Sequence, residues 1–173
     1  MLRLALAALL LLLSGPVRAD PAVEGAFDAA IAAFERALPR LPASLMGVDV
    51  AAYRDALTLR RFASAHWGGV VTLEVELRAE AGGSCRRYAA FVRIPPENGR
   101  ARLVICPEFL TPGTEALRAL TILHELVHVV AGPDECRAMA FAARVELLAT
   151  GRFTPVDGYW RANGCDSSAF RLP

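Results

Sequence analysis

The spacing of apolar residues predicts two helices in the first third of the chain. Over residues 22–38 the apolar side chains recur at helical spacing and form one stripe, and Pro39 ends the pattern. A second amphipathic pattern covers residues 50–65, with its charged side chains on the other side, and a Trp-Gly-Gly sequence at 67–69 interrupts the chain after it. We therefore expect two helices that each bury one face.

The middle of the chain has the pattern of strands. Apolar and polar residues alternate over residues 71–77, which predicts a half-buried strand. Two further strands are predicted over residues 88–94, ended by the proline pair at 95–96, and over residues 102–106, after an Asn-Gly turn. Three strands at such close spacing favour an antiparallel sheet over alternating strand–helix units.

Helical patterns return in the last third of the chain. Thr114 is a suitable N-cap for a helix that reaches about residue 131 and stops at a Gly-Pro pair. A further helix is predicted over residues 134–150, with a glycine directly after it. Residues 152–173 are rich in Gly, Pro and aromatic residues and predict a packed irregular tail. Helices and strands are thus segregated along the chain, which predicts an α+β fold.

The beginning of the chain has the pattern of an export signal. Arg3 supplies a positive charge, residues 4–13 form an apolar run, and Val-Arg-Ala at 17–19 offers a small residue for cleavage. A membrane span needs roughly twenty apolar residues, so this run is too short for one. We expect a signal peptide over residues 1–19, one domain over residues 20–173, and a periplasmic or secreted protein without stable membrane insertion.

Charge narrows the possible partners. Without Arg3 and Arg18 the chain has 17 basic and 18 acidic residues, so the mature protein is close to neutral. It has no basic run and no basic patch interleaved with aromatic residues, which argues against nucleic acid as a partner. Nothing in the pattern favours an obligate oligomer, and we expect a monomer.

Four cysteines predict two disulfides, because an exported chain meets an oxidising compartment. Three pairings are possible. We favour Cys85–Cys106, which would join neighbouring strands, together with Cys136–Cys165, which would attach the tail to a helix. A structural zinc site made of cysteines is the alternative, but no CxxC spacing supports it.

The strongest chemical signal is the sequence His124-Glu125-Leu126-Val127-His128, which reads HExxH. On a helix, positions i and i+4 share a face, so both imidazoles can bind one ion. Glu125 lies one position further round, where it can accept a proton from water on that ion without binding the ion itself. This pattern is typical of a Zn²⁺ site with Glu125 as a general base.

A zinc site that keeps an open position takes three protein ligands, so one more is needed. The acidic candidates downstream are Asp134, Glu135, Glu146 and Asp157. The Gly-Pro break lets the chain reverse, so that the first turn of the next helix can face back toward the histidines. Asp134 and Glu135 fit this geometry, whereas Glu146 would lie roughly 16 Å further along the helix.

These residues resemble the zincin metallopeptidases. HELVH, followed by ECRA at 135–138 and FAA at 141–143, resembles the gluzincin pattern HExxH…ExxAxxFAA. VICPEF at 104–109 and TIL at 121–123 are similar to the deuterolysin-like aspzincins, whose GTxxD motif supplies an aspartate ligand. Here only Gly-Pro-Asp is present at 132–134, after a shorter spacer. The resemblance covers about residues 85–150.

The resemblance implies a zincin-like fold, in which a small sheet packs on the HExxH helix, and zinc as the cofactor. It also implies Glu135 as the third ligand, which we favour over Asp134. In zincins an edge strand commonly binds extended substrate, and residues 70–77 or 102–106 are the candidates. A His or Tyr often donates to the oxyanion. We favour Tyr159, downstream of the ligand helix, over the other candidates, which are His66, Tyr53 and Tyr88.

The sequence therefore predicts an exported zinc-dependent peptidase that acts on a peptide or protein, with Glu125 as general base. One alternative is an exported zinc-binding or interaction domain that has the zincin scaffold without turnover. Another is a disulfide-stabilised inhibitor or binder without metal, for which the HExxH sequence would be accidental.

Overall fold

The computed structural model describes residues 20–173 as a mixed α+β protein with five α-helices. The expected signal peptide, residues 1–19, lies outside the described residues. Within residues 20–173, no helix has both the length and the apolar character needed to cross a membrane. The helices are α1 (Pro21–Ala37), α2 (Val50–Leu57), α3 (Glu115–Ala131), α4 (Glu135–Thr150) and α5 (Asp157–Ala162).

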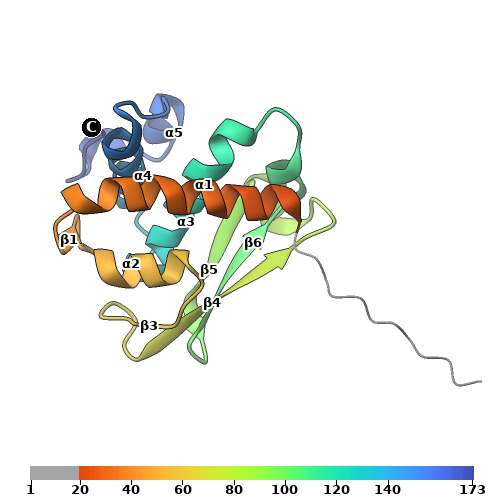
Figure 1. Cartoon of the computed structure of the whole chain (residues 1–173). Coiled ribbons are helices and arrows are strands. Elements are labelled where there is room, and N and C mark those ends of the chain that lie inside the picture. The colour runs from red at the N-terminus through yellow and green to blue at the C-terminus, as the bar shows by residue number, and fades with distance from the viewer. Residues whose placement is uncertain (1–19) are drawn as a thin grey trace, which may run out of the picture.

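The strands form a two-stranded ribbon and a four-stranded sheet. In Figure 1 the sheet lies beside the group of helices, and α1 passes across the helices. Each strand of the main sheet presents apolar residues to that group on alternate positions, such as Leu73, Leu103 and Ala90, which are all buried. The strands are β1 (Ser44–Leu45), β2 (Val48–Asp49), β3 (Phe62–Ala63), β4 (Val70–Leu77), β5 (Ala90–Glu97) and β6 (Arg100–Ile105).

The main sheet is mixed, so the expected antiparallel sheet is wrong in one pairing. The strand order is β3-β4-β6-β5. β5 and β6 form an antiparallel hairpin across the Asn-Gly turn, but β4 pairs with β6 in parallel, from Thr72 opposite Arg100 to Leu77 opposite Ile105. The reason is that residues 78–89 carry the chain past the inner position before β5 begins, and the hairpin then returns β6 beside β4.

The position of β5 at the edge of the sheet also explains its length. The strand continues to Glu97 instead of ending before the proline pair, with a shift in register between Arg93 and Glu97. Proline has no N–H to donate, so it is tolerated at an edge or in a bulge and not in a central strand. β5 therefore leaves one side of its backbone without a partner strand in the described sheet.

The first helix agrees closely with its prediction, and the second is shorter. α1 begins after Asp20, whose carboxylate accepts the Ala22 N–H at 2.8 Å. α2 ends at Leu57, after which Leu59 has a positive φ of 57° and the chain turns into β3. Phe62 is buried, but it is buried as part of the sheet. Periodicity does not separate helix from strand over so short an apolar run.

Aromatic side chains hold α1, α2, α3 and α4 together. Phe34 packs on Tyr53 with ring centroids 5.0 Å apart, and Tyr53 packs on Phe141 at 4.8 Å. The Tyr53 hydroxyl, fully buried, donates to the Leu123 carbonyl oxygen at 2.7 Å. Because Leu123 precedes His124, this hydrogen bond connects the centre of the core to the helix that carries the HExxH sequence.

The two favoured disulfides, Cys85–Cys106 and Cys136–Cys165, are confirmed. Cys85 lies in a single 3₁₀ turn (Gly83–Arg86) before β5 and not in a strand as expected. Cys165 follows α5, so the second disulfide connects the first turn of α4 to the C-terminal segment. That segment is not wholly irregular, because Val156 and Trp160 are buried and α5 forms around them.

Candidate metal centre

A tight turn between α3 and α4 brings the three predicted ligands together. α3 ends at Ala131 and is followed by Gly132, whose φ of 87° is readily adopted only by glycine, and α4 begins at Glu135. The Asp134 carboxylate accepts the Arg137 N–H at 2.9 Å and caps α4. The chain therefore reverses within three residues, and Glu135 in the first turn of α4 faces the two histidines of α3.

The distances within this group fit one ion. His124 Nε2 lies 3.1 Å from His128 Nε2 and 3.0 Å from Glu135 Oε2, and His128 Nε2 lies 3.4 Å from the same oxygen. Tetrahedral zinc bound at about 2.0–2.1 Å separates its ligand atoms by roughly 3.3 Å. His124, His128 and Glu135 could therefore hold a metal ion, and two imidazoles with one carboxylate form a donor set that suits zinc.

Hydrogen bonds prepare His128 and Glu135 to act as ligands. The Gly132 carbonyl can only accept, so His128 Nδ1, which lies 2.9 Å away, carries a proton, and Nε2 is the ring nitrogen that can bind a metal. Burial opposes the charge of Glu135, but its contacts with His124 and His128 and the hydrogen bond from Tyr159 outweigh burial and hold the pKa of this carboxyl well below its usual range. Glu135 is therefore anionic at neutral pH.

His124 is oriented mainly by packing. It is buried, and burial lowers the pKa of its imidazole, which favours the neutral form that binds metal. Its Nδ1 is buried and finds no hydrogen-bond partner among the described residues. The ring makes edge contacts with His128 and with Tyr159, at centroid distances of 4.9 and 5.5 Å.

Glu125 lies beside the three-residue group without belonging to it. Its side chain is only 8 % exposed, yet it lines cavities on both sides of the site. Burial, opposed by His128 and supported by Glu135, raises the pKa of the Glu125 carboxyl to about 8. A buried carboxyl of this kind can gain or lose a proton near neutral pH.

Tyr159 contacts the site from α5. Its hydroxyl donates to Glu135 Oε2 at 2.5 Å and lies 3.4 Å from His124 Nε2. Burial and then Glu135 raise the pKa of Tyr159 well above its usual value, so the phenol keeps its proton. The sequence predicted Tyr159 as an oxyanion donor; the structure places its hydroxyl beside the three-residue group, in contact with Glu135.

The other acidic candidates, Asp134, Glu146 and Asp157, lie outside the group that could hold a metal ion. Asp134 caps α4, as described above. Glu146 accepts hydrogen bonds from the backbone N–H and the side chain of Thr154, at 2.9 and 3.2 Å. Asp157 is exposed in the first turn of α5. Neither Glu146 nor Asp157 belongs to the group that could hold the metal ion.

The remaining candidates for an oxyanion donor divide into three cases. Tyr53 is buried in the core and its hydroxyl is engaged by Leu123. His66 stacks edge-on against Trp67 and packs against Gly132, so it lies over the end of α3. Tyr88 lines the cavities on both sides of the site. Of these three residues, only Tyr88 faces the open space next to the metal ligands.

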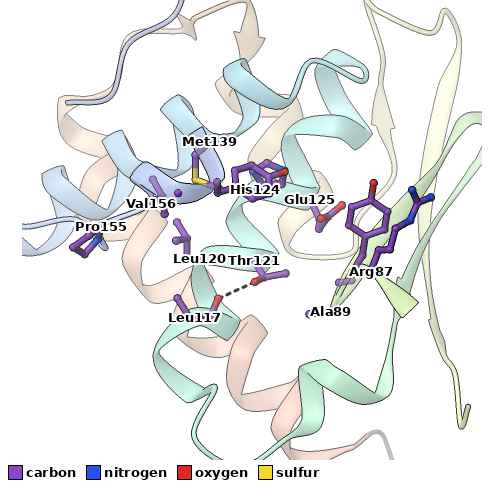
Figure 2. Close-up of a pocket in the computed structure, with 14 residues that line it drawn as sticks. Arg87, Ala89, Leu117, Leu120, Thr121, His124, Glu125, Met139, Pro155 and Val156 are labelled. Carbon is purple, nitrogen blue, oxygen red and sulfur yellow. Dashed lines mark hydrogen bonds between the residues drawn. The ribbon is translucent and has the colours of Figure 1, made fainter. Parts of the chain in front are cut away.

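Two cavities form a cleft along the site. The larger has a volume of about 460 Å³, and Figure 2 shows Leu117, Thr121 and Glu125 along α3 on one side of it, with Arg87 and Ala89 opposite. The smaller, about 210 Å³, is bordered by β5. Residues of β4 and β6, which were the expected substrate-binding strands, line neither cavity. The edge strand β5 takes this position because the parallel pairing places β6 inside the sheet.

The apolar wall of the larger cavity was not predicted from the sequence. It includes Leu117 and Leu120, one to two turns before His124 on α3, and Met139 and Val156 from the following elements. Helical spacing places Leu117 and Leu120 on the same face as His124, and this was a signal that sequence reasoning could have used. Met139 and Val156 join them only through the packing of α4 and α5.

The Cys136–Cys165 disulfide connects the neighbour of Glu135 to the segment after Tyr159, so we expect it to support the metal centre. Replacing both cysteines by alanine should weaken zinc affinity by about 10- to 100-fold, the usual effect of losing support around a ligand. Chelator competition measures this change in zinc affinity.

The matched control is the double variant Cys85→Ala with Cys106→Ala. The two disulfides have similar sequence separations, 29 residues for Cys136–Cys165 and 21 for Cys85–Cys106, so their loss should have similar effects on stability. Equal losses of zinc affinity in both variants would contradict the prediction.

Comparison with known proteins does not assign a family to this chain. No protein-family model, no curated protein and no solved structure matches it. The features that indicate a function are therefore those of the site: three convergent atoms that could bind a metal, a buried carboxyl beside them, and a cleft that passes both.

Proposed function

We propose that this protein is an exported zinc-dependent peptidase with a zincin-like active site. The observation that carries the proposal is the position of Glu125, a buried carboxyl on the wall of the cleft directly beside His124, His128 and Glu135. A site that only stores metal has no need for an acid–base group that faces a substrate-sized space. The two disulfides and the pattern of residues 1–19 support export.

His124, His128 and Glu135 would hold the zinc ion. When bound, zinc acidifies a water molecule and polarises the substrate carbonyl. Glu125 accepts the proton of the attacking water on its carboxylate and then transfers it to the nitrogen of the leaving amine. Burial of Glu125 keeps its affinity for this proton high, so that it can both accept and return it.

The edge strand β5 and the cleft favour an extended peptide as substrate. The free side of β5 has backbone donors and acceptors that an extended chain can pair with. The larger cavity beside Glu125 has mostly apolar side chains, including Leu117, Leu120 and Met139. We therefore propose that an apolar side chain of the substrate enters this cavity next to the bond that is cleaved.

Elemental analysis and a cleavage assay test this function. We expect about one zinc per chain in the oxidised protein. We also expect cleavage of unfolded, fluorescently labelled casein, which 1,10-phenanthroline abolishes and added zinc restores. Bound zinc without cleavage of casein or of a random peptide library would support a zinc-binding domain without turnover. A protein that takes up no zinc on reconstitution would exclude both functions.

A further inference from the structure

Hydrolysis of a peptide bond places negative charge on the carbonyl oxygen, and a hydrogen-bond donor in the cleft stabilises it. Tyr159 has the expected side chain, but its single hydroxyl proton is donated to Glu135 Oε2. To donate to an oxyanion instead, the Tyr159 hydroxyl would have to break its hydrogen bond to Glu135 in the transition state. Its contacts suit a different task, which is to hold the Glu135 carboxylate in place.

Tyr88 lies on the wall of this cleft, as does Glu125. Among residues 20–173, four line both cavities of the cleft, and these are Tyr88, Ala90, Glu125 and Tyr159. Tyr88 therefore stands at the junction of the two cavities, on the wall that leads into β5 and across from α3. Its hydroxyl has no hydrogen-bond partner among the described residues, and the residue is 46 % exposed. A tyrosine hydroxyl without a partner in this position can donate to a ligand in the cleft.

The backbone around Tyr88 is held in place. The Tyr88 N–H donates to the Ser84 carbonyl at 3.2 Å, and the Cys106 N–H donates to the Ala89 carbonyl at 2.9 Å. The disulfide between Cys85 and Cys106 attaches the same segment to the end of β6. Because the backbone of this segment is already fixed, little backbone conformational entropy is lost when substrate binds. This favours a role for Tyr88 in binding the transition state.

The neighbouring arginine packs on the ring of Tyr88. The Arg87 guanidinium lies over the Tyr88 ring, 5.5 Å from its centroid. Attraction between a cation and the face of an aromatic ring favours this arrangement of the two side chains, which helps to keep the ring in one orientation.

We propose that Tyr88 is a catalytic residue whose hydroxyl donates a hydrogen bond to the carbonyl oxygen as it becomes an oxyanion. This inference rests on the proposed peptidase function. The two tyrosines of the cleft then have different roles: Tyr88 contacts the substrate oxygen, and Tyr159 positions the metal ligand Glu135.

The test is steady-state cleavage of labelled casein by zinc-loaded Tyr88→Phe. This change removes only the hydroxyl from an exposed ring, so zinc content and thermal unfolding should stay as in the wild type. We expect kcat to fall by about 10- to 100-fold, toward the lower end of the effect of losing an oxyanion donor, because zinc also carries part of the charge. KM should change little, since the contact forms only in the transition state.

Tyr159→Phe is the matched variant. It removes the same hydroxyl from the other side of the cleft, and we expect it to weaken zinc affinity in chelator competition, which Tyr88→Phe should not. Unchanged kcat in Tyr88→Phe, or a raised KM with unchanged kcat, would overturn the role of Tyr88 while leaving the peptidase function intact. A zinc-loaded wild type that cleaves nothing would instead overturn the function itself, and the role of Tyr88 with it.

Discussion

Glu125→Gln should abolish peptide cleavage while leaving zinc bound. We expect a loss in kcat of at least about 10³-fold, because glutamine cannot accept the proton of the attacking water. The three atoms that could hold the ion come from His124, His128 and Glu135, so none is lost. The measurements are kcat on labelled casein and zinc content of the same preparation.

The fold should tolerate this change. Burial raises the pKa of the Glu125 carboxyl to about 8, so in the metal-free protein at neutral pH the side chain is mostly an uncharged acid. Glutamine has the same shape and is also uncharged, so it buries no new charge. Glu108→Gln is a suitable control, because Glu108 is exposed and lines neither cavity. A Glu125→Gln protein with wild-type turnover would show that another group moves the proton.

Glu135→Ala should remove zinc from the protein. Loss of an outer partner of a ligand weakens metal affinity by about 10- to 100-fold, and loss of the ligand itself should weaken it further. The Glu135 carboxylate also accepts a hydrogen bond from Tyr159, so its removal leaves this donor unpaired. Zinc content after dialysis and chelator competition measure the effect.

Asp134→Ala is the matched control, since it removes the adjacent carboxylate. Asp134 caps α4 through the Arg137 N–H. Its loss should lower stability by about 1 kcal/mol, the usual cost of losing an N-cap, and should leave zinc bound. If Asp134→Ala loses zinc and Glu135→Ala keeps it, then the first turn of α4 is rearranged when the metal binds, and the assignment of Glu135 is wrong.

The agreement between sequence and structure differs from element to element for physical reasons. α1, α3 and α4 are predictable because each is long and apolar on the side or sides that it buries, and Asp20, Gly132 and Gly151 mark their ends. α1 buries one stripe, whereas residues 122–131 of α3 and 138–143 of α4 are buried throughout. The course of residues 58–63 could not be predicted, because a few apolar residues satisfy a helix and a strand equally well. The parallel pairing of β4 with β6 depends on the path of residues 78–89, which has no local pattern.

The residues that could hold a metal ion show the same division. The two histidines and Glu125 are predictable because helical geometry alone places them, within a single turn of α3. Asp134 and Glu135 are adjacent acids that local reasoning could not separate. The structure separates them because the N-cap position directs one carboxylate to the backbone of α4, and the next residue points back at α3.

The sequence by itself determined the HExxH helix, its partner helix and the types of ligand, since these depend on spacing along one helix or across one short turn. Only the tertiary structure decided which strand borders the cleft, which tyrosine contacts Glu135 and which remains free. Those answers depend on residues that are far apart in the chain. β5 borders the site because β6 occupies the inner position of the sheet. Tyr159 reaches the site because α5 packs through Trp160 and the Cys136–Cys165 disulfide attaches the segment after it to α4. Contacts of this kind follow from how the whole core packs, and no local pattern of residues encodes them.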